Sequence, residues 1–146
     1  MRLTKNTNFQ IAKGLLNDVF TKTEPLDYDK WVRFVDSHST FFIWNENTES
    51  GKMTLQNIDE ISENFKERVL ASLNKGGCFA EYDSIKENYN ISVSINKVNN
   101  WITIQFARTP RLEDLRIFVE MANYLDAYLL VDGTKIIDEK VLENLG

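Results

Sequence analysis

The spacing of hydrophobic residues changes along the chain between a helical period of 3.6 and a strand period of 2. Over residues 8–21 apolar side chains recur three and four positions apart behind a Thr-x-x-Gln capping box, which predicts a first helix. Residues 27–37 fit both periods, and we interpret them as a second helix that places Trp31 and Val35 on one face. Two helices are therefore expected before residue 40.

The middle of the chain predicts a hairpin followed by a helix. Segments 40–44 and 52–56 are rich in aromatic residues or alternate apolar with polar residues, and the polar segment 45–51 would form the loop between them. Residues 60–73 return to the helical period and end before a Gly-Gly pair. The expected buried face of this helix consists of Ile61, Phe65, Val69, Leu70 and Leu73.

From Cys78 onward the period is 2, which indicates three antiparallel strands over 78–83, 89–95 and 101–106, joined at the second turn by 97–100. Because hydrophobic and polar residues alternate strictly, one face of this sheet should contact water.

The C-terminal part predicts a helix, a hairpin and a last helix. Thr109-Pro110 would be an N-cap followed by a first-turn proline, and the helix would extend to Leu125. Segments 127–131 and 134–137 would pair through an Asp-Gly turn before a short helix at 138–145.

The predicted order is α-(α)-β-β-α-β-β-β-α-β-β-α, which is typical of an α+β fold with a mainly antiparallel sheet and helices packed on one face. A length of 146 residues favours a single domain over 1–146. Within it, 1–57 would form a helical and hairpin extension on a 58–146 core.

Composition and charge exclude several classes of function. There are 17 Lys and Arg against 22 Asp and Glu, a net charge of −5, which gives no general attraction to nucleic acid or to an anionic membrane and suits a basic protein partner. The longest apolar run is too short to span a bilayer, and the start lacks the apolar region of a signal peptide, so we expect a cytoplasmic protein. One Cys and one His make no zinc motif, and no phosphate-binding loop is present, so we expect no metal and no cofactor.

Two arginines form the candidate anion site. Arg108 and Arg111 flank a predicted helix N-terminus, whose free N–H groups favour a phosphate, a sulfate or a carboxylate. The alternative is that Glu113 and Asp114 already compensate both charges. A thiolate–imidazole pair of Cys78 and His38 would be the available nucleophilic dyad, but a cysteine that opens an apolar strand is more often a small buried residue.

Aromatic and acidic residues are the candidate partner-binding set. Exposed rings of this kind suit a protein interface, while the alternative is that helices 8–21 or 60–75 cover them and make them core. The candidate residues are Phe42, Trp44, Glu46, Glu49 and Trp101.

The segment from Tyr89 to Glu139, with its strand pair, its Thr109-Pro110 helix start and its hairpin AYLLVDGTKIID, resembles the C-terminal part of small bacterial toxin-immunity proteins. The element order from residue 58 also resembles type III secretion chaperones. Both resemblances imply a protein that binds another protein, so we expect a non-enzymatic binding module that neutralises a toxin or effector. The alternatives are a small-molecule or anion-binding protein or small enzyme with a pocket between sheet and helices, and a homodimer that pairs a sheet edge.

Overall fold

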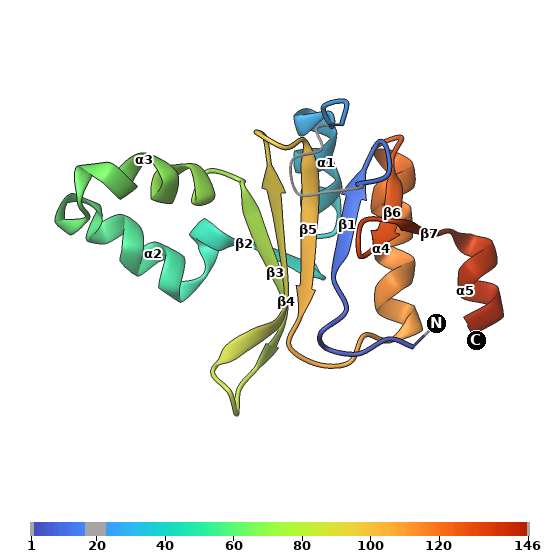
Figure 1. Ribbon diagram of the computed structural model, residues 1–146. Helices are drawn as coiled ribbons and strands as arrows, with labels where there is room; N and C mark the ends of the chain where they lie inside the picture. The colour runs from blue at the N-terminus through green and yellow to red at the C-terminus, as the bar shows by residue number, and fades with distance from the viewer. Residues whose placement is uncertain (1, 17–22, 146) are drawn as a thin grey trace.

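A computed structural model describes residues 2–16 and 23–145 and contains one seven-stranded sheet (Figure 1). The strands are β1 (Phe9–Ala12), β2 (Phe42–Trp44), β3 (Gly77–Asp83), β4 (Asn88–Asn96), β5 (Trp101–Phe106), β6 (Tyr128–Val131) and β7 (Lys135–Ile137). Their order in the sheet is β2-β3-β4-β5-β1-β6-β7, and every pairing is antiparallel.

The described helices are α1 (Tyr28–Ser37), α2 (Glu49–Gln56), α3 (Glu63–Ser72), α4 (Leu112–Tyr124) and α5 (Glu139–Leu145), with 3-10 turns η1 (Asn45–Asn47) and η2 (Ile58–Glu60). Helices and an antiparallel sheet together confirm the α+β prediction. Within these ranges no helix has both the length and the apolar character needed to cross a membrane.

The core lies between one face of the sheet and the helices α1 and α4. Alternating residues of the central strands point into it, and α1 and α4 add large rings to the same cluster. The largest fully buried side chains include Trp31, Phe9, Phe118, Ile11, Ile91 and Ile102. Because this face is continuous from β2 to β7, the helices bury it as one layer.

The first predicted helix is wrong, because residues 9–12 form the interior strand β1. Phe9 pairs with Ile104 on one side and with Val131 on the other. Phe9 and Ile11 enter the main core, whereas Ala12 joins a second buried cluster on the opposite face of the sheet. A strand buried on both faces has no strict alternation, so its pattern resembles a helix. Residues 17–21 of that predicted helix lie outside the described residues.

The position of β1 also bears on the domain organisation. β1 lies between β5 and β6, and β2 pairs with β3, so strands from the first 57 residues belong to the same sheet as the strands that follow. The strands β1 and β2, both from the first 57 residues, are thus part of this sheet.

The predicted hairpin over 40–57 is half wrong. Its first strand is β2, but residues 49–56 form helix α2, and β2 pairs with β3 instead. The Thr48 hydroxyl accepts a hydrogen bond from the Gly51 N–H at 3.0 Å and caps α2. This N-cap starts a helix where an alternating sequence suggested a strand.

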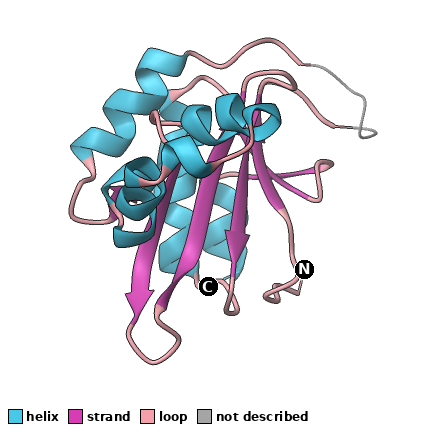
Figure 2. Cartoon of the chain, turned by 90° about the vertical axis from the view of Figure 1, so that its left-hand side faces the viewer, coloured by secondary structure: helices cyan, strands magenta, loops and turns pink. Residues whose placement is uncertain are grey.

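Residues 49–73, here called the arm, contain α2, η2 and α3 and project from the β2 edge of the sheet (Figure 1). In Figure 2, which looks from the side of the arm, its helices lie in front of the edge of the sheet. Helix α3 confirms the predicted helix, but no residue of α3 is buried and Phe65 is 54% exposed. The expected apolar face of this helix is therefore not a core face; of its five residues only Leu73, just past the helix, is buried.

The later elements follow the prediction closely. Strands β3, β4 and β5, the β6–β7 hairpin and α5 lie where expected, and the hairpin turn has positive φ at Asp132 (53°) and Gly133 (75°). Helix α4 starts two residues later than the predicted Thr109-Pro110 start. Its N-cap is Arg111, whose backbone N–H donates to the Asp114 carboxylate at 2.9 Å.

Candidate functional site

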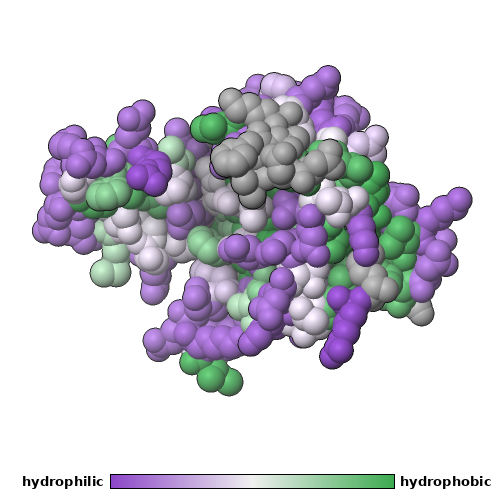
Figure 3. All heavy atoms as spheres, viewed as in Figure 1, coloured by the Kyte–Doolittle hydropathy of each residue, from purple (hydrophilic) through white to green (hydrophobic). Residues whose placement is uncertain are grey.

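A groove separates the arm from the β3–β4 hairpin. Its volume is about 1190 Å³. The space-filling view shows the molecule notched between the arm and the hairpin (Figure 3). The apolar residues that line it are Met53 and Ile61 from the arm and Phe79, Tyr82 and Tyr89 from the hairpin.

Three aromatic rings form the hairpin side of the groove. The rings of Phe79 and Tyr89 stack at a centroid distance of 5.3 Å, and Tyr82 meets Tyr89 edge to face at 5.1 Å. Phe79 and Tyr82 are three positions apart, so strict alternation would place them on opposite faces of the sheet. Glu81 between them has a φ of 58°, in the left-handed region, and this interrupts the alternation so that all three rings line one groove.

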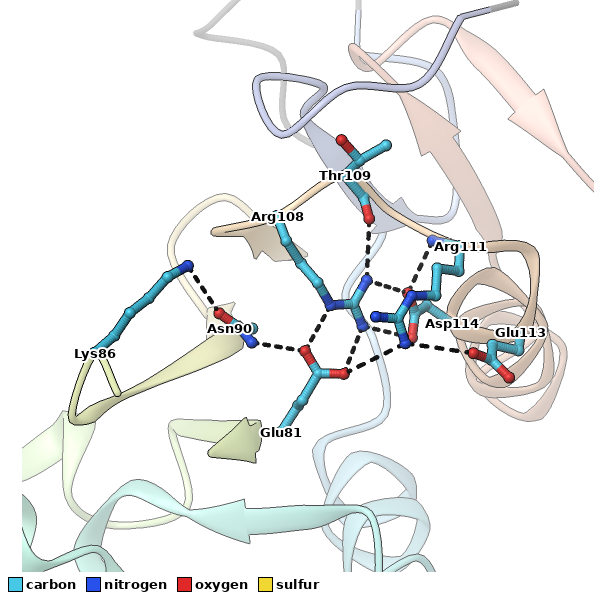
Figure 4. Close-up of polar contacts among 8 residues, drawn as sticks. All are labelled: Glu81, Lys86, Asn90, Arg108, Thr109, Arg111, Glu113 and Asp114. Carbon is cyan, nitrogen blue, oxygen red and sulfur yellow. Dashed lines mark hydrogen bonds and ion pairs between the residues drawn. The ribbon is translucent and has the colours of Figure 1, made fainter. Parts of the chain in front are cut away.

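Arg108 holds Glu81 in this conformation through a partly buried network of hydrogen bonds (Figure 4). The Arg108 guanidinium donates to the Glu81 carboxylate through Nε and Nη2, the latter at 2.8 Å, and to Asp114 through Nη1 at 2.8 Å and Nη2 at 3.1 Å. Asn90 donates to Glu81 at 2.7 Å. The network joins the β3–β4 hairpin to the first turn of α4 and fixes the backbone next to Tyr82.

The same contacts shift two ionisation equilibria. The hydrogen bond from Arg108 holds the pKa of Glu81 below its ordinary value, against the opposing effect of partial burial. Hydrogen bonds to Glu81 and Asp114 raise the pKa of Arg108 above its already high value. Glu81 and Arg108 are therefore both charged near neutral pH, and only 15% of the Arg108 side chain is exposed.

Several polar side chains of the groove already have partners inside the chain. Thr48 caps α2, the Asn57 amide donates to the Met53 carbonyl at 3.1 Å, and Asn88 accepts from the Tyr89 N–H at 2.8 Å. The carboxylates of Glu49, Glu60 and Glu87 line the groove, and within the described part of the chain they make no hydrogen bond or ion pair. The charged side chains that line the groove are consequently all anionic.

The base of the arm is fastened to the body at Lys75. Its backbone N–H donates to the Glu46 carboxylate at 2.8 Å, and its carbonyl accepts from Trp31 Nε1 at 2.9 Å. The Asn45 amide adds a bond to the Ser72 carbonyl at 3.3 Å. These contacts set the angle at which the arm leaves the sheet.

The structure separates the aromatic and acidic residues that the sequence grouped for partner binding. Phe42 and Trp44 lie in the core, with Trp44 Nε1 donating to Asp36 at 2.9 Å, so both are core residues as in the alternative interpretation. Their rings meet Phe118 of α4 and Trp31 of α1, and not the helices over 8–21 or 60–75 that were expected to cover them. Trp101 is half-buried and packs against the second cluster on the opposite face of the sheet. Glu46 fastens the arm, and Glu49 alone of the five lines the groove.

Arg108 and Arg111 are both near carboxylates. Arg108 is enclosed by Glu81 and Asp114 as described above, while Arg111 is 58% exposed in its side chain and lies 3.6 Å from Glu113 and 3.9 Å from Glu81. Asp114 compensates the charge of Arg108, as the alternative interpretation of the sequence proposed. Glu81, which the sequence analysis did not consider for this role, is a second carboxylate that pairs with Arg108. An anion would have to compete with these carboxylates for Arg108.

Cys78 and His38 occupy separate places. Cys78 is buried on β3 among core residues, and burial raises the pKa of its thiol, with a further contribution from the charge of Glu46. His38 ends α1, where its ring stacks on Phe34 at 4.1 Å and its Nε2 lies 3.6 Å from Glu120. Over residues 2–16 and 23–145 no group of three or more His, Cys, Asp or Glu is arranged to hold a metal.

Sequence reasoning missed most of the groove, including Met53, Tyr82, Glu87 and Tyr89. The available signal was a hairpin with three rings in eleven residues, but strict alternation would place Phe79 and Tyr82 on different faces of the sheet. Comparisons of the chain with protein-family models, curated proteins and solved structures find no match. The geometry of the groove is therefore the basis for a functional proposal.

Proposed function

We propose that this chain is a non-enzymatic binding module that holds a segment of another protein in the groove between the arm and the β3–β4 hairpin. The observation that carries the proposal is the combination, in one groove, of exposed apolar side chains with carboxylates that have no partner in the described residues.

The size of the groove favours a polypeptide over a small molecule. Small-molecule pockets usually have volumes of about 300–1,000 Å³ and enclose their ligand, so a larger and open groove suits several consecutive side chains. Met53 is 62% exposed and Tyr82 is 56% exposed in the free chain. Apolar side chains gathered in this way and rimmed by polar residues are typical of protein interaction sites.

The charge of the groove selects the partner. Glu49, Glu60 and Glu87 line it, and no Lys, Arg or His is among its described lining residues. The whole chain carries a net charge of −5, so a second copy would meet repulsion there, whereas a basic segment would be attracted. A basic, partly apolar segment of a different protein is the occupant that fits.

The resemblances to toxin-immunity proteins and to secretion chaperones imply the same class of function. Proteins of that class act by covering a surface of their partner. If the partner is a toxin, the groove would neutralise it by covering a basic part of its surface.

Capture from an extract of the cells that make this protein tests the proposal. Three baits are compared. They are the wild-type chain, a Met53→Asp variant that places a charge in the groove, and a Tyr128→Asp control at an exposed position of β6 outside the groove. We expect one protein to bind the wild type and the control in stoichiometric amounts and to be lost from Met53→Asp. Cross-links should map to residues 49–61 and 79–89.

A partner that binds Met53→Asp as well as the wild type, or that cross-links only outside these segments, would contradict the proposal. So would the absence of any stoichiometric partner. Circular dichroism of each bait excludes misfolding as the cause, since Met53 makes no contribution to the core.

A further inference from the structure

We infer that the aromatic end of the groove, formed by Phe79, Tyr82 and Tyr89, is a recognition site for an arginine side chain of the bound segment. This inference rests on the proposed function and names the chemistry that the groove selects.

The rings offer a surface that a cation can use. Phe79 and Tyr89 stack with an interplanar angle of 26°, and Tyr82 stands at 71° to Tyr89, so the cluster presents ring faces in two directions. The face of an aromatic ring carries negative electrostatic potential and attracts a cation within about 6 Å. Exposure of Tyr82 leaves this surface open to a partner.

Other aromatic rings of the chain already have a cation of their own. Lys97 Nζ lies 3.7 Å from the centroid of Tyr28, Arg68 lies 5.5 Å from Phe65, and Lys30 lies 6.0 Å from Tyr124. In the portion of the chain that the structure describes, Phe79, Tyr82 and Tyr89 have no such neighbour. The groove cluster therefore differs from these rings in lacking an internal cation.

The carboxylates in the groove supply the second half of the site. Glu49, Glu60 and Glu87 line the same groove as the three rings and are not neutralised by lining cations. The nearby Lys86 instead directs its amine to Asn90 at 3.4 Å, on the side of the Arg108 network (Figure 4). A cation from the partner would thus meet rings and carboxylates together.

The combination favours arginine over lysine. A planar guanidinium can stack on a tyrosine ring and still donate its edge N–H groups to a carboxylate, whereas an ammonium is a compact and strongly hydrated charge. Arg108 shows both contacts in this chain, since it pairs with two carboxylates and lies 5.9 Å from the ring of Phe106.

Titration of the ¹⁵N-labelled full chain with N-acetyl-arginine methylamide tests the inference by NMR. We expect saturable shifts confined to residues 79–89 and the groove side of α2, with a dissociation constant on the order of millimolar, as is usual for a single side chain. The citrulline analogue has the same shape without the charge, and it should produce no saturable shift. The lysine analogue should bind about fivefold more weakly.

Three variants locate the site. Tyr82→Leu should weaken binding about tenfold, and Glu87→Gln about fivefold, because each removes one component of the recognition. Tyr128→Leu, a matched change at an exposed tyrosine outside the groove, should leave the titration unchanged. Equal shifts from the citrulline analogue, tighter binding of the lysine analogue, or insensitivity to Tyr82→Leu would overturn the inference.

This outcome is separable from that of the capture experiment. A groove-dependent partner with no response to the arginine probe would overturn the arginine site and leave the binding function standing. An arginine-specific response with no groove-dependent partner would contradict the proposed function and support the site.

Discussion

Glu81 combines an unfavourable backbone conformation with an ion pair to Arg108 that is made through two hydrogen bonds. Its left-handed φ costs of the order of 1 kcal/mol or more for a residue with a side chain. Two hydrogen bonds from Arg108 and one from Asn90 offset this cost. As a result, Tyr82 lies in the groove. The Arg108–Glu81 contact, on the helix side of the sheet, thereby positions the Tyr82 ring on the opposite side.

Glu81→Gln should destabilise the protein in a pH-dependent way. The folded-state pKa of Glu81 is lowered by Arg108, so its stabilising contribution is fully present above the unfolded-state pKa near 4.5 and is lost as the pH falls through the folded value. Urea denaturation from pH 7 to pH 3 should show a stability difference between wild type and variant that is constant near neutrality and shrinks on acidification. A difference that grows at low pH would contradict this assignment.

The thiol of Cys78 should be inert in the native protein. It is 1% exposed, and burial raises its pKa, so both access and thiolate formation are suppressed. Reaction with an aromatic disulfide reagent at pH 8 should be negligible in buffer and complete in denaturant. Rapid native reaction, at the rate of the unfolded chain, would mean that β3 is not packed as described.

At the scale of elements, the arm explains where sequence reasoning failed. Residues 52–56 alternate apolar with polar, as a strand does, yet they lie in α2, where Met53 and Leu55 are both exposed. A helix without a core face needs no 3.6-residue stripe, so periodicity gives no information about it. By contrast, α4, β4 and β5 each bury one face, and their limits were predicted to within two or three residues.

Helix α2 should be sensitive to substitution of Gly51. A Cβ at Gly51 would lie 1.9 Å from the Asn45 carbonyl oxygen, which is backbone and cannot move without displacing η1. Gly51→Ala should therefore cost about 1–3 kcal/mol or detach the start of α2. Chemical denaturation measures the loss of stability, and amide hydrogen exchange over residues 45–57 detects detachment of the start of α2.

Gly14→Ala is the matched control, because its Cβ would meet only the Thr23 methyl at an ordinary 3.9 Å. Equal behaviour of the two alanine variants would show that η1 and α2 are not packed as tightly as the structure indicates.

At the scale of the molecule, β1 makes the sheet one cooperative unit. It lies in the sheet between β5 and β6, strands about ninety or more residues away in sequence, and Ile11 is fully buried there. Ile11→Ala should cost about 2–5 kcal/mol, the usual range for truncation of a buried isoleucine. Ile85→Ala, at a position that is 93% exposed, should change the free energy of unfolding by less than about 0.5 kcal/mol.

Urea denaturation of both variants provides the comparison. Similar midpoints for Ile11→Ala and Ile85→Ala would mean that β1 is dispensable and that the N-terminal residues form an appendage to the sheet.

The fold class was predictable from the sequence, but the groove was not. The groove joins residues 49–61 to residues 79–89, and this contact depends on how the arm is fastened at Lys75. It depends also on the left-handed φ of Glu81, although glutamate has no preference for that backbone conformation. Both are consequences of tertiary contacts that local periodicity does not contain.

Site-specific photo-cross-linking in the native cells tests the central claim most directly. p-Benzoylphenylalanine replaces Met53 inside the groove or Tyr128 outside it, both exposed in the free chain. The account predicts one discrete adduct from position 53, joined to a basic segment of another protein and abolished by Glu87→Lys, and none from position 128. No adduct from position 53, or the same adducts from both positions, would contradict it.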